Sequence, residues 1–540
     1  MAGMRKQHHA LAVPFPGQGH ANPLMRLCTR LAAHHSFTIT FLDIHHEIAA
    51  DPSPASDKKL SPVPTDPSPA AADEEPSPVP ISHHKPSLAA GDGEHSPAPI
   101  AHDEPSPAAG DGETSPAPIE PSPAPIAHDQ PSPALLQKLD IRRVRLPLLL
   151  PPPSSTPVSM METFFVSAQN LAPQIEQLLL LQDPPISCVI SDLFMTGATQ
   201  VVADKLHLAR FALIPCSQSM LLHFHHILEG GLSLEEVMKV SSQRELLSED
   251  VFKDGLQGLP TLKVGDLMEN LGEDLFMYSF ICQALQETKS QSMGLVANSF
   301  EEIEGSALKV NMGAPVYVVG PLVESLEKEV GTSLLAEDDA CLLWLDQQPS
   351  SSVLFISFGS FISISSTQFE ELVAGLLSSH QRFLWVMRPN LIKDASCSTF
   401  SEQLLSKSHG KGYVVSWAPQ VKVLSHPSIQ GFFTHCGWNS TLEAISRGVP
   451  MICFPCLGDQ FMNAKLIVEE WKVGVHLRKS KKIGLVKREE VESAIRALME
   501  DEQGKTLHEN ALRVKQACHQ SHLPGGYAFH NVQALAQSLT

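Results

Sequence analysis

A short polar turn carries the side chains best suited to hold a phosphate group. The turn, Thr434–Ser440, contains His435, Asn439 and Ser440, follows an apolar strand-like run and leads into a helical pattern. The first N–H groups of a helix lack intrahelical acceptors, and the helix N-terminus carries a partial positive charge. Such a turn is therefore a suitable binding site for an anion, and the three polar side chains add further hydrogen-bond donors to it.

Residues on both sides of this turn extend the pattern to a longer ligand. Trp417 can stack on a base, and Glu443, one helical turn beyond the polar turn, can accept hydrogen bonds from sugar hydroxyls. Asp459 and Gln460 follow the next predicted strand, Met451–Phe454, and can reach the far end of the same ligand. The order along the chain indicates a nucleotide sugar laid across one site.

The stretch from Trp417 to Gln460 resembles the signature of the plant secondary product UDP-dependent glycosyltransferases. It has the family's length of 44 residues and both of its ends, Trp-Ala-Pro-Gln and Asp-Gln. The resemblance implies that Trp417 stacks on uracil, that the region of Gln420 contacts the base edge, and that Glu443 holds the ribose hydroxyls. It further implies diphosphate binding by His435, Asn439 and Ser440, with Gly437 in the same turn, and sugar binding by Trp438, Asp459 and Gln460.

A histidine and an aspartate far from this stretch could activate an acceptor hydroxyl. His20 follows the predicted strand Leu11–Phe15, at the start of a helix whose positive end favours a neutral imidazole. An alcohol is a poor nucleophile until its proton is accepted, a task that suits histidine. Asp192 follows the predicted strand Ser187–Ser191 and can orient the imidazole. The resemblance agrees, because the family's base and its aspartate partner occupy these positions.

Strands and helices alternate along two parts of the chain, which predicts an α/β protein with parallel sheets. In the first helix we expect Asn22 at the N-cap and Pro23 in the first turn. We also predict one helix over Phe164–Leu181, and a less regular region from Pro260 to Asn298. Further predicted strands are Phe37–Leu42, Leu139–Leu146, Phe211–Ile214, Val316–Val319, Val353–Phe358, Phe383–Met387 and Tyr413–Ser416.

The resemblance implies the GT-B fold, in which two Rossmann-like domains with parallel sheets face each other across a cleft. We expect an N-terminal acceptor-binding domain over residues 1–322 and a linker over 323–340. A C-terminal UDP-sugar-binding domain would cover 341–510, and the final segment, 511–540, would cross back to the N-terminal domain.

Residues 51–134 differ in composition from the rest of the chain. They hold roughly half of the 43 prolines and no Phe, Tyr or Trp, so they cannot bury enough apolar surface to offset chain entropy. Residues 89–94 recur at 108–113, but the repeat has no core positions that could stack. We predict a disordered, partly polyproline insertion after the second strand.

Charge and cysteine content exclude several classes of partner. The net charge is −20, of which residues 51–134 contribute −11 through 14 acidic residues and three lysines, so nucleic acid is not an expected partner.

No apolar run approaches the ~20 residues of a membrane-spanning helix, and Ala10–Val13 is too short for a signal peptide. Ten scattered cysteines fit the reduced thiols of a cytoplasmic protein. His223, His225 and His226 lack a partner at metal-ligand spacing.

The predicted function is inverting transfer of glucose from UDP-glucose to a hydroxyl or carboxyl of a small lipophilic acceptor, by a monomer. No cofactor or metal is required, because the helix N-terminus, His435 and the Gly359–Ser360 turn can meet the leaving-group charge. Gln460, where some relatives have histidine, favours glucose over galactose, whereas Pro215–Ser217 departs from the Thr or Ser of many relatives. Two alternatives remain open: a nucleotide-sugar epimerase, and a non-catalytic UDP-sugar-binding scaffold whose insertion recruits partners.

Overall fold

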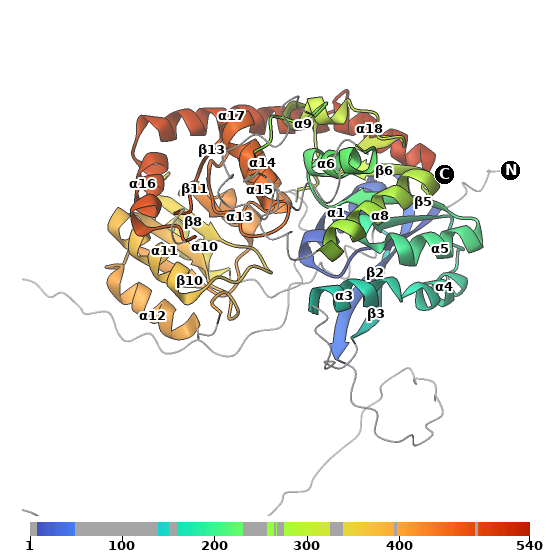
Figure 1. The fold of residues 1–540 in the computed structure, drawn as a ribbon, viewed down its shortest axis with the longest axis horizontal. Coiled ribbons are helices and arrows are strands. Elements are labelled where there is room, and N and C mark those ends of the chain that lie inside the picture. Colours follow the sequence, from blue (N-terminus) through green and yellow to red (C-terminus); the bar gives the residue numbers. More distant parts are fainter. Residues whose placement is uncertain are drawn as a thin grey trace, which may run out of the picture. The chain divides into compact units, whose positions relative to one another are not determined.

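Two parallel β-sheets, each flanked by helices, organise the chain in the computed structural model (Figure 1). The structure describes residues 8–48, 139–150, 160–230, 256–263, 266, 275–323, 339–393, 397–480 and 484–540. The predicted insertion over residues 51–134 and nearly all of the predicted linker lie outside these ranges. We refer to the elements from β1 to β7 as the N-terminal half and to those from α10 to α16 as the C-terminal half.

The seven-stranded sheet of the N-terminal half has the order β3-β2-β1-β4-β5-β6-β7, and all neighbouring strands pair in parallel. Its central strands are continuous apolar runs because helices cover both faces of a parallel sheet. The strands are β1 (His8–Val13), β2 (Phe37–Ile48), β3 (Ile141–Leu150), β4 (Cys188–Asp192), β5 (Ala209–Ile214), β6 (Gly294–Ala297) and β7 (Val316–Val318). The helices are α1 (Gln18–His35), α3 (Met160–Gln169), α4 (Ala172–Leu180), α5 (Thr196–Leu206), α6 (Gln218–Leu228), α8 (Leu275–Gln291) and α9 (Glu301–Leu308), with a 3-10 turn at Leu193–Met195.

The six-stranded sheet of the C-terminal half has the order β10-β9-β8-β11-β12-β13 and repeats the arrangement of the first. Its strands are β8 (Val353–Ser357), β9 (Arg382–Val386), β10 (Gly412–Val415), β11 (Ile429–Thr434), β12 (Met451–Cys453) and β13 (Gly474–His476). Its helices are α10 (Ala340–Asp346), α11 (Ser366–Ser379), α12 (Cys397–Lys407), α13 (Gln420–Leu424), α14 (Trp438–Arg447), α15 (Gln460–Lys465) and α16 (Arg488–Met499), with a π-helical turn at Leu466–Glu470. In both sheets the strand order reverses beside the first strand, which is where such folds bind ligands. The predicted pair of Rossmann-like sheets is confirmed.

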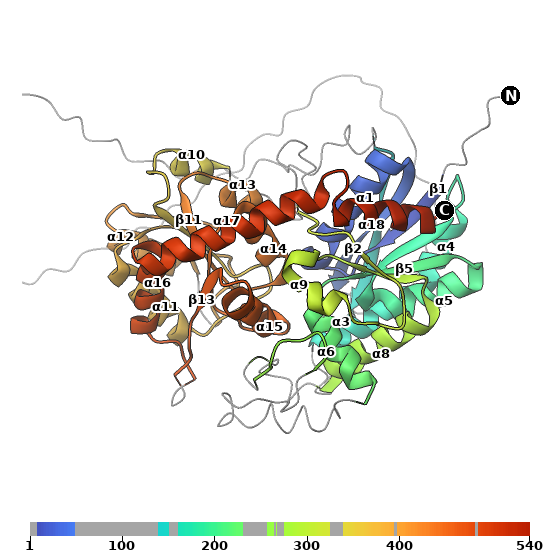
Figure 2. The same ribbon diagram turned by 90° about the horizontal axis from the view of Figure 1, so that it is seen from above.

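The last two helices connect the two halves. α17 (Glu502–His522) packs on α14 and α16 of the C-terminal half and on α9 of the N-terminal half. α18 (Tyr527–Ser538) then packs on β7 and α1, as can be followed in Figure 2. Leu535 and Leu539 of this segment lie in the same apolar cluster as Ala10 and Leu27. The C-terminal residues are therefore part of the core of the first sheet.

Buried polar contacts join the halves, which pack as one compact unit. The indole N–H of Trp438 donates to the carbonyl of Asn298 over 2.9 Å. The ammonium group of Lys465, whose side chain is 2% exposed, lies 3.1 Å from a carboxylate oxygen of Asp266. Because an unpaired polar group in a buried position is destabilising, these contacts hold only one arrangement of the two surfaces.

The start of α1 differs from the prediction. β1 ends at Val13 rather than Phe15, since Pro14 has no N–H to give to the ladder of a central strand. The prediction of Asn22 as N-cap is wrong, because α1 begins at Gln18 with Gly17 at the N-cap and Pro23 lies inside the helix. Pro23 lacks the N–H that would bond to the Gly19 carbonyl, which leaves that carbonyl free for another donor.

Two other elements also differ from the prediction. The region predicted as one helix, Phe164–Leu181, contains two helices, α3 and α4, because Pro173 near the start of α4 cannot donate to the preceding turn. Strand β6 falls inside the region predicted as less regular. It has only four residues, too few to show a periodicity, and its Gly294 lies so close to Tyr317 that a Cβ would be 2.8 Å from the ring.

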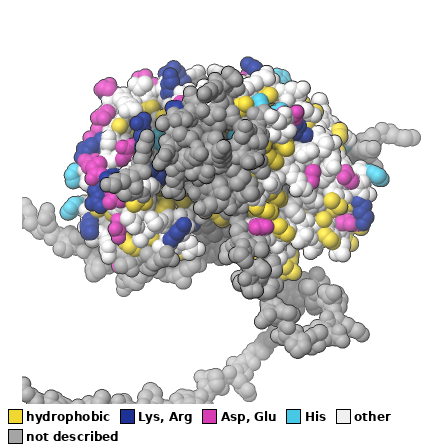
Figure 3. All heavy atoms as spheres, viewed as in Figure 1, with side chains coloured by type: hydrophobic (Ala, Val, Ile, Leu, Met, Phe, Trp, Pro, Cys, Tyr) yellow, Lys and Arg dark blue, Asp and Glu magenta, His cyan; other side chains and the backbone are white. Residues whose placement is uncertain are grey.

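Charged groups of both signs are interspersed on the face of the molecule shown in Figure 3. Among the described helices, none is sufficiently long and apolar to cross a membrane. The cysteines whose side chains are described all have free thiols. His223 is fully buried, and this burial lowers its pKa to about 4, so it is a neutral core residue. Within the described ranges, no three His, Cys, Asp or Glu side chains are grouped so that they could hold a metal ion.

Substitution Leu535→Ala should lower the free energy of unfolding by about 2–5 kcal/mol, because the Leu535 side chain is fully buried between α18 and the first sheet. Urea unfolding followed by circular dichroism measures the change. Gln533→Ala, at an exposed position of the same helix, is the control and should change stability by less than about 0.5 kcal/mol. An unchanged midpoint for Leu535→Ala would show that α18 is not part of this core.

Candidate functional site

The turn between β11 and α14 presents unpaired backbone donors. The first hydrogen bond inside α14 runs from Thr441 N to Gly437 O, so the N–H groups of residues 438–440 have no acceptor within the helix. No acidic residue occupies the first turn, and no side chain caps the helix. This is the turn predicted to bind an anion, and its backbone has the donors that such a site needs.

His435 lies between two glycines at the base of this turn. A Cβ on Gly359 or Gly437 would lie 2.6 or 2.5 Å from His435 Nε2, so the imidazole can sit here only because both residues are glycine. Burial, together with the charge of Arg388, lowers the pKa of His435 to about 4, and the ring is therefore neutral. Ser360 is exposed at the end of β8, the strand that pairs with β11, and so lies beside the same turn.

Three residues predicted to bind the base edge, the ribose and the diphosphate, Gln420, Glu443 and Ser440, lie together on α13 and α14. The amide nitrogen of Gln420 donates to Ser440 Oγ over 2.9 Å and to Glu443 Oε2 over 2.8 Å. The other carboxylate oxygen of Glu443 accepts from Arg26 Nη2 over 3.0 Å. Trp417 is half-buried and packs against the core of the C-terminal half. Arg26, which belongs to the N-terminal half, was not predicted; it is one of two arginines among the mostly apolar residues 24–31 of α1.

Two neighbouring residues of α14 contact the N-terminal half. Trp438 is 3% exposed, and its indole N–H is taken by the carbonyl of Asn298, so its backbone N–H is the group that remains for a ligand. Asn439 Nδ2 donates to the carbonyl of Gly19 over 2.5 Å. This is the carbonyl that Pro23 leaves without a helical donor, and the proline thereby makes a contact between the halves possible.

The residues predicted for the sugar end follow β12, the other neighbour of β11. Gln460 Oε1 accepts from the N–H groups of Cys456 and Leu457 and so holds the loop after β12. Asp459 Oδ2 accepts from Asn463 Nδ2 over 2.9 Å. Burial raises the pKa of the Asp459 carboxyl to about 6, and the charge of His20 acts in the opposite direction.

The predicted base and its partner lie in contact at the edge of the first sheet. His20 Nδ1 is 2.8 Å from Asp192 Oδ2, and the other oxygen of Asp192 accepts from the backbone N–H of Phe194. The Asp192 side chain is fully buried, whereas that of His20 is 21% exposed. Because Nδ1 faces the carboxylate, Nε2 is the nitrogen that can accept a proton from a ligand.

The backbone beside His20 contacts the donor stretch directly, because the Gly19 carbonyl accepts from Asn439 Nδ2. Burial raises the pKa of the Cys216 thiol well above its usual value, and the carboxylates of Asp459, Glu304 and Asp192 add to the effect. The base pair and the donor stretch therefore lie near each other.

Aromatic rings lie beside the imidazole of His20. Its ring centroid lies 5.1 Å from that of Phe15 and 5.2 Å from that of Phe194. Phe165 and Phe280 continue this apolar wall, with centroids 4.9 Å apart. A ligand group brought to His20 is therefore in an apolar environment.

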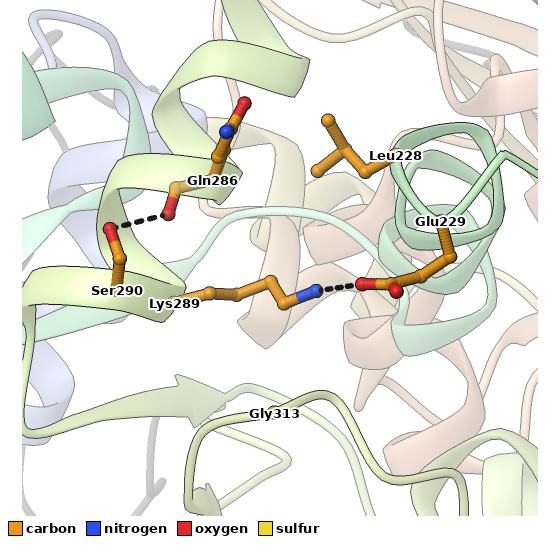
Figure 4. A pocket seen from close by; sticks show the side chains of 6 residues that line it. All are labelled: Leu228, Glu229, Gln286, Lys289, Ser290 and Gly313. Atoms are coloured by element: carbon orange, nitrogen blue, oxygen red, sulfur yellow. Dashed lines mark hydrogen bonds and ion pairs between the residues drawn. The ribbon is translucent and has the colours of Figure 1, made fainter.

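A separate pocket of about 300 Å³ lies between the end of α6 and α8 (Figure 4). It is lined by Leu228, Glu229, Gln286, Lys289, Ser290 and Gly313. Lys289 Nζ points across it to Glu229 Oε1 at 2.7 Å, so the two charges already satisfy each other. None of the predicted site residues lines this pocket.

The fold and the site together define a nucleotide-sugar-dependent glycosyltransferase of the GT-B class, and comparison with known proteins gives the family. A profile described as UDP-glucoronosyl and UDP-glucosyl transferase matches residues 250–522. UDP-glycosyltransferase 85A7 of Arabidopsis thaliana is 36% identical over 362 residues, which cover 63% of this chain and 72% of that protein. The 7-deoxyloganetin glucosyltransferase of Catharanthus roseus is 33% identical over 373 residues, covering 66% of this chain and 74% of that protein.

Solved structures agree with this relationship. A UDP-glucosyltransferase from Polygonum tinctorium, capable of glucosylating indoxyl and solved with 3,4-dichloroaniline, is 27% identical with a TM-score of 0.71, covering 99% of both chains. UGT2 of Phytolacca americana, solved with UDP-2-fluoro-glucose and pterostilbene, is 25% identical with a TM-score of 0.69, covering 99% of this chain and 100% of the other. The chain belongs to the UDP-glycosyltransferase family and is a plant-type member of it.

Substitution Gly437→Ala should weaken UDP binding about tenfold or more, because the added methyl would lie 2.5 Å from His435 Nε2 and displace the ring from the turn. Titration calorimetry measures the affinity. Gly305→Ala in α9 is the matched control, since its Cβ would meet only Glu301 Cγ at an ordinary 3.5 Å. Equal UDP affinities for the two variants would contradict the view that this close approach shapes the binding site.

Proposed function

We propose that this enzyme transfers glucose from UDP-glucose, with inversion, to a hydroxyl or carboxyl group of a small lipophilic acceptor. The observation that carries the proposal is the 2.8 Å contact between His20 Nδ1 and Asp192 Oδ2, beside Gly19, whose carbonyl accepts from Asn439 of the donor stretch. An imidazole oriented by a buried carboxylate is a suitable general base. Three of the proteins compared above, the 7-deoxyloganetin glucosyltransferase and the two solved enzymes from Polygonum tinctorium and Phytolacca americana, act on or bind small lipophilic molecules, which supports an acceptor of this kind.

In the proposed reaction, Nε2 of His20 accepts the proton of the acceptor oxygen. That oxygen attacks the anomeric carbon from the face opposite UDP, a new C–O bond forms, and the bond to the β-phosphate oxygen breaks. UDP leaves with the electron pair of that bond, and Asp192 stabilises the imidazolium. The unpaired N–H groups of α14 and the neutral His435 meet the charge on the leaving group, so that no metal ion is needed in this step.

The donor is proposed to lie along α13, α14 and the loop after β12. Trp417 would stack on uracil and Gln420 would contact the base edge, while Glu443 would hold the ribose. The diphosphate would be bound by His435, Gly437, Asn439, Ser440 and Ser360, and the glucose by the backbone of Trp438 with Asp459 and Gln460. The contacts of Gln420 with Ser440 and Glu443 support this arrangement, because they place three of these residues side by side.

The acceptor is proposed to enter against the phenylalanine side chains around His20, which supports an apolar acceptor. We propose that residues 1–322 act as the acceptor domain and 341–510 as the donor domain, with 323–340 as linker and 511–540 returning to the first domain. The packing of α18 on β7 and α1 supports the last point. The free thiols of the described cysteines support a location in a reducing compartment such as the cytoplasm. We also propose that the enzyme is a monomer, because a single chain contains the whole proposed site.

Substitution His20→Ala should lower kcat at least about 10²-fold and leave UDP binding unchanged, because His20 acts on the acceptor and not on the nucleotide. Turnover with a panel of phenols and terpenoid alcohols, assayed by product formation from UDP-glucose, measures the loss. His34→Ala, at an exposed position of the same helix, is the control and should retain full activity. Wild-type turnover in the His20 variant would exclude histidine as the base.

Binding of UDP-glucose should weaken up to about tenfold between pH 7 and pH 5, whereas binding of UDP should change less. The raised pKa of Asp459, about 6, means that its carboxyl is ionised above this pH and protonated below it, and a neutral carboxyl is a weaker acceptor for sugar hydroxyls. Calorimetric titrations with both ligands at the two pH values test this difference. In Asp459→Asn the extra pH dependence of UDP-glucose should disappear, and its persistence would show that another group is responsible.

A further inference from the structure

A buried ion pair connects the helix that carries the base with the helix that carries the ribose residue. Arg26 of α1 donates from Nη2 to Glu443 Oε1 of α14 over 3.0 Å, and both side chains are 8% exposed. Arg26 Nη1 also donates to the carbonyl of Leu322, where the chain leaves the first sheet. The guanidinium is thus held at two points, one in each half.

Glu443 is satisfied from both sides in this arrangement, with Arg26 on one oxygen and Gln420 on the other. An ionised carboxylate offers about four lone-pair positions, so the two contacts leave room for two further donors. Hydrogen bonds to an ionised carboxylate are shorter and stronger than those to a neutral group. A carboxylate with this little exposure and no cation beside it would be destabilised in its place and would turn towards water.

We propose that Arg26 is a positioning residue of the donor site, which holds the Glu443 carboxylate in the orientation that accepts the two ribose hydroxyls of the UDP-sugar. The inference rests on the proposed function of Glu443 as the ribose residue. Arg26 itself contacts Glu443 and the backbone of Leu322, and it acts on the nucleotide through Glu443.

The position of Arg26 also ties the base to the donor. Gly19, next to His20, bonds to Asn439, and Arg26, two turns along α1, bonds to Glu443, one turn along α14. Two contacts along each helix fix both the spacing and the rotation of α1 on α14. The side chain that orders the ribose residue therefore also helps to hold the helix of the general base against the donor helix.

Arg30 provides a matched comparison on the same helix. It lies one turn beyond Arg26 and donates to the carbonyls of Val319 and Pro321, in the same exit segment as Leu322. Its hydrogen bonds go to these carbonyls and to His522, and none of them reaches Glu443. Replacing Arg30 therefore disturbs the attachment of α1 to this segment and leaves the ion pair with Glu443 in place.

The test compares the affinities of the full-length enzyme for UDP and for 2′,3′-dideoxy-UDP, which lacks both ribose hydroxyls. In the wild-type enzyme UDP should bind about tenfold or more tightly than the analogue. Arg26→Met and Arg26→Gln should lower this ratio of affinities at least about fivefold. Arg26→Lys should retain part of the ratio, because lysine keeps the positive charge. Arg30→Met should leave the ratio unchanged. In turnover assays, the Arg26 variants should raise the KM for UDP-glucose more than they lower kcat.

The outcomes separate two hypotheses: that Glu443 binds the ribose, and that Arg26 positions Glu443. A wild-type enzyme that does not distinguish the two nucleotides would refute the ribose role of Glu443 and, with it, the role of Arg26. A wild-type enzyme that distinguishes them, with Arg26→Met and Arg26→Gln unchanged in ratio, would overturn the positioning role and leave the proposed function intact. Because the ratio is measured within each variant, a general loss of stability does not imitate the expected result, and Arg26→Lys tests the same point if the uncharged variants fail to fold.

Discussion

Parallel strands all end at the same edge of their sheet, and this constraint assembles the candidate site. β1 and β4 are neighbours, so His20, in the helix after β1, and Asp192, at the end of β4, lie in contact. In the second sheet β11 lies between β8 and β12, and the loops after these three strands carry Ser360, His435 and Asp459. The functional side chains lie at strand ends, in the loops that follow and in the first turns of helices, and the ladders of hydrogen bonds behind them set their distances.

Buried polar contacts between the halves determine how the two edges meet. Three buried donors each find an acceptor on the opposite half: the indole N–H of Trp438, the ammonium group of Lys465 and the guanidinium group of Arg26. A hydrogen bond lost in such a place leaves a group without a partner in a low-dielectric environment, which destabilises by about 1–3 kcal/mol. Directional contacts of this kind select one arrangement of two apolar surfaces, whereas apolar packing alone permits several similar ones.

Some features could be read from local sequence because they depend on neighbouring residues only. The strand predicted at Phe211–Ile214, a short apolar run, falls within β5 (Ala209–Ile214), and the helix N-terminus predicted after the polar, glycine-containing turn is that of α14. Features that depend on distant residues were missed or wrong. Pro23 was expected in the first turn of α1, yet the helix begins at Gln18, and the Gly19 carbonyl, which Pro23 cannot serve, accepts from Asn439 more than 400 residues away. Likewise, nothing near Arg26 in the sequence indicates that its partner is Glu443.

The sequence by itself determined the kinds of residue present and their local conformation: two sets of alternating strands and helices, a helix N-terminus suited to phosphate, and a histidine at the start of another helix. These depend on periodicity, on proline and glycine, and on the chemistry of single side chains, all of which act over a few residues. Only the tertiary structure decided which of these groups meet. The pairing of His20 with Asp192 requires adjacent strands, and that of Arg26 with Glu443 requires two helices from different sheets, because contacts across such separations are set by how whole sheets and helices pack.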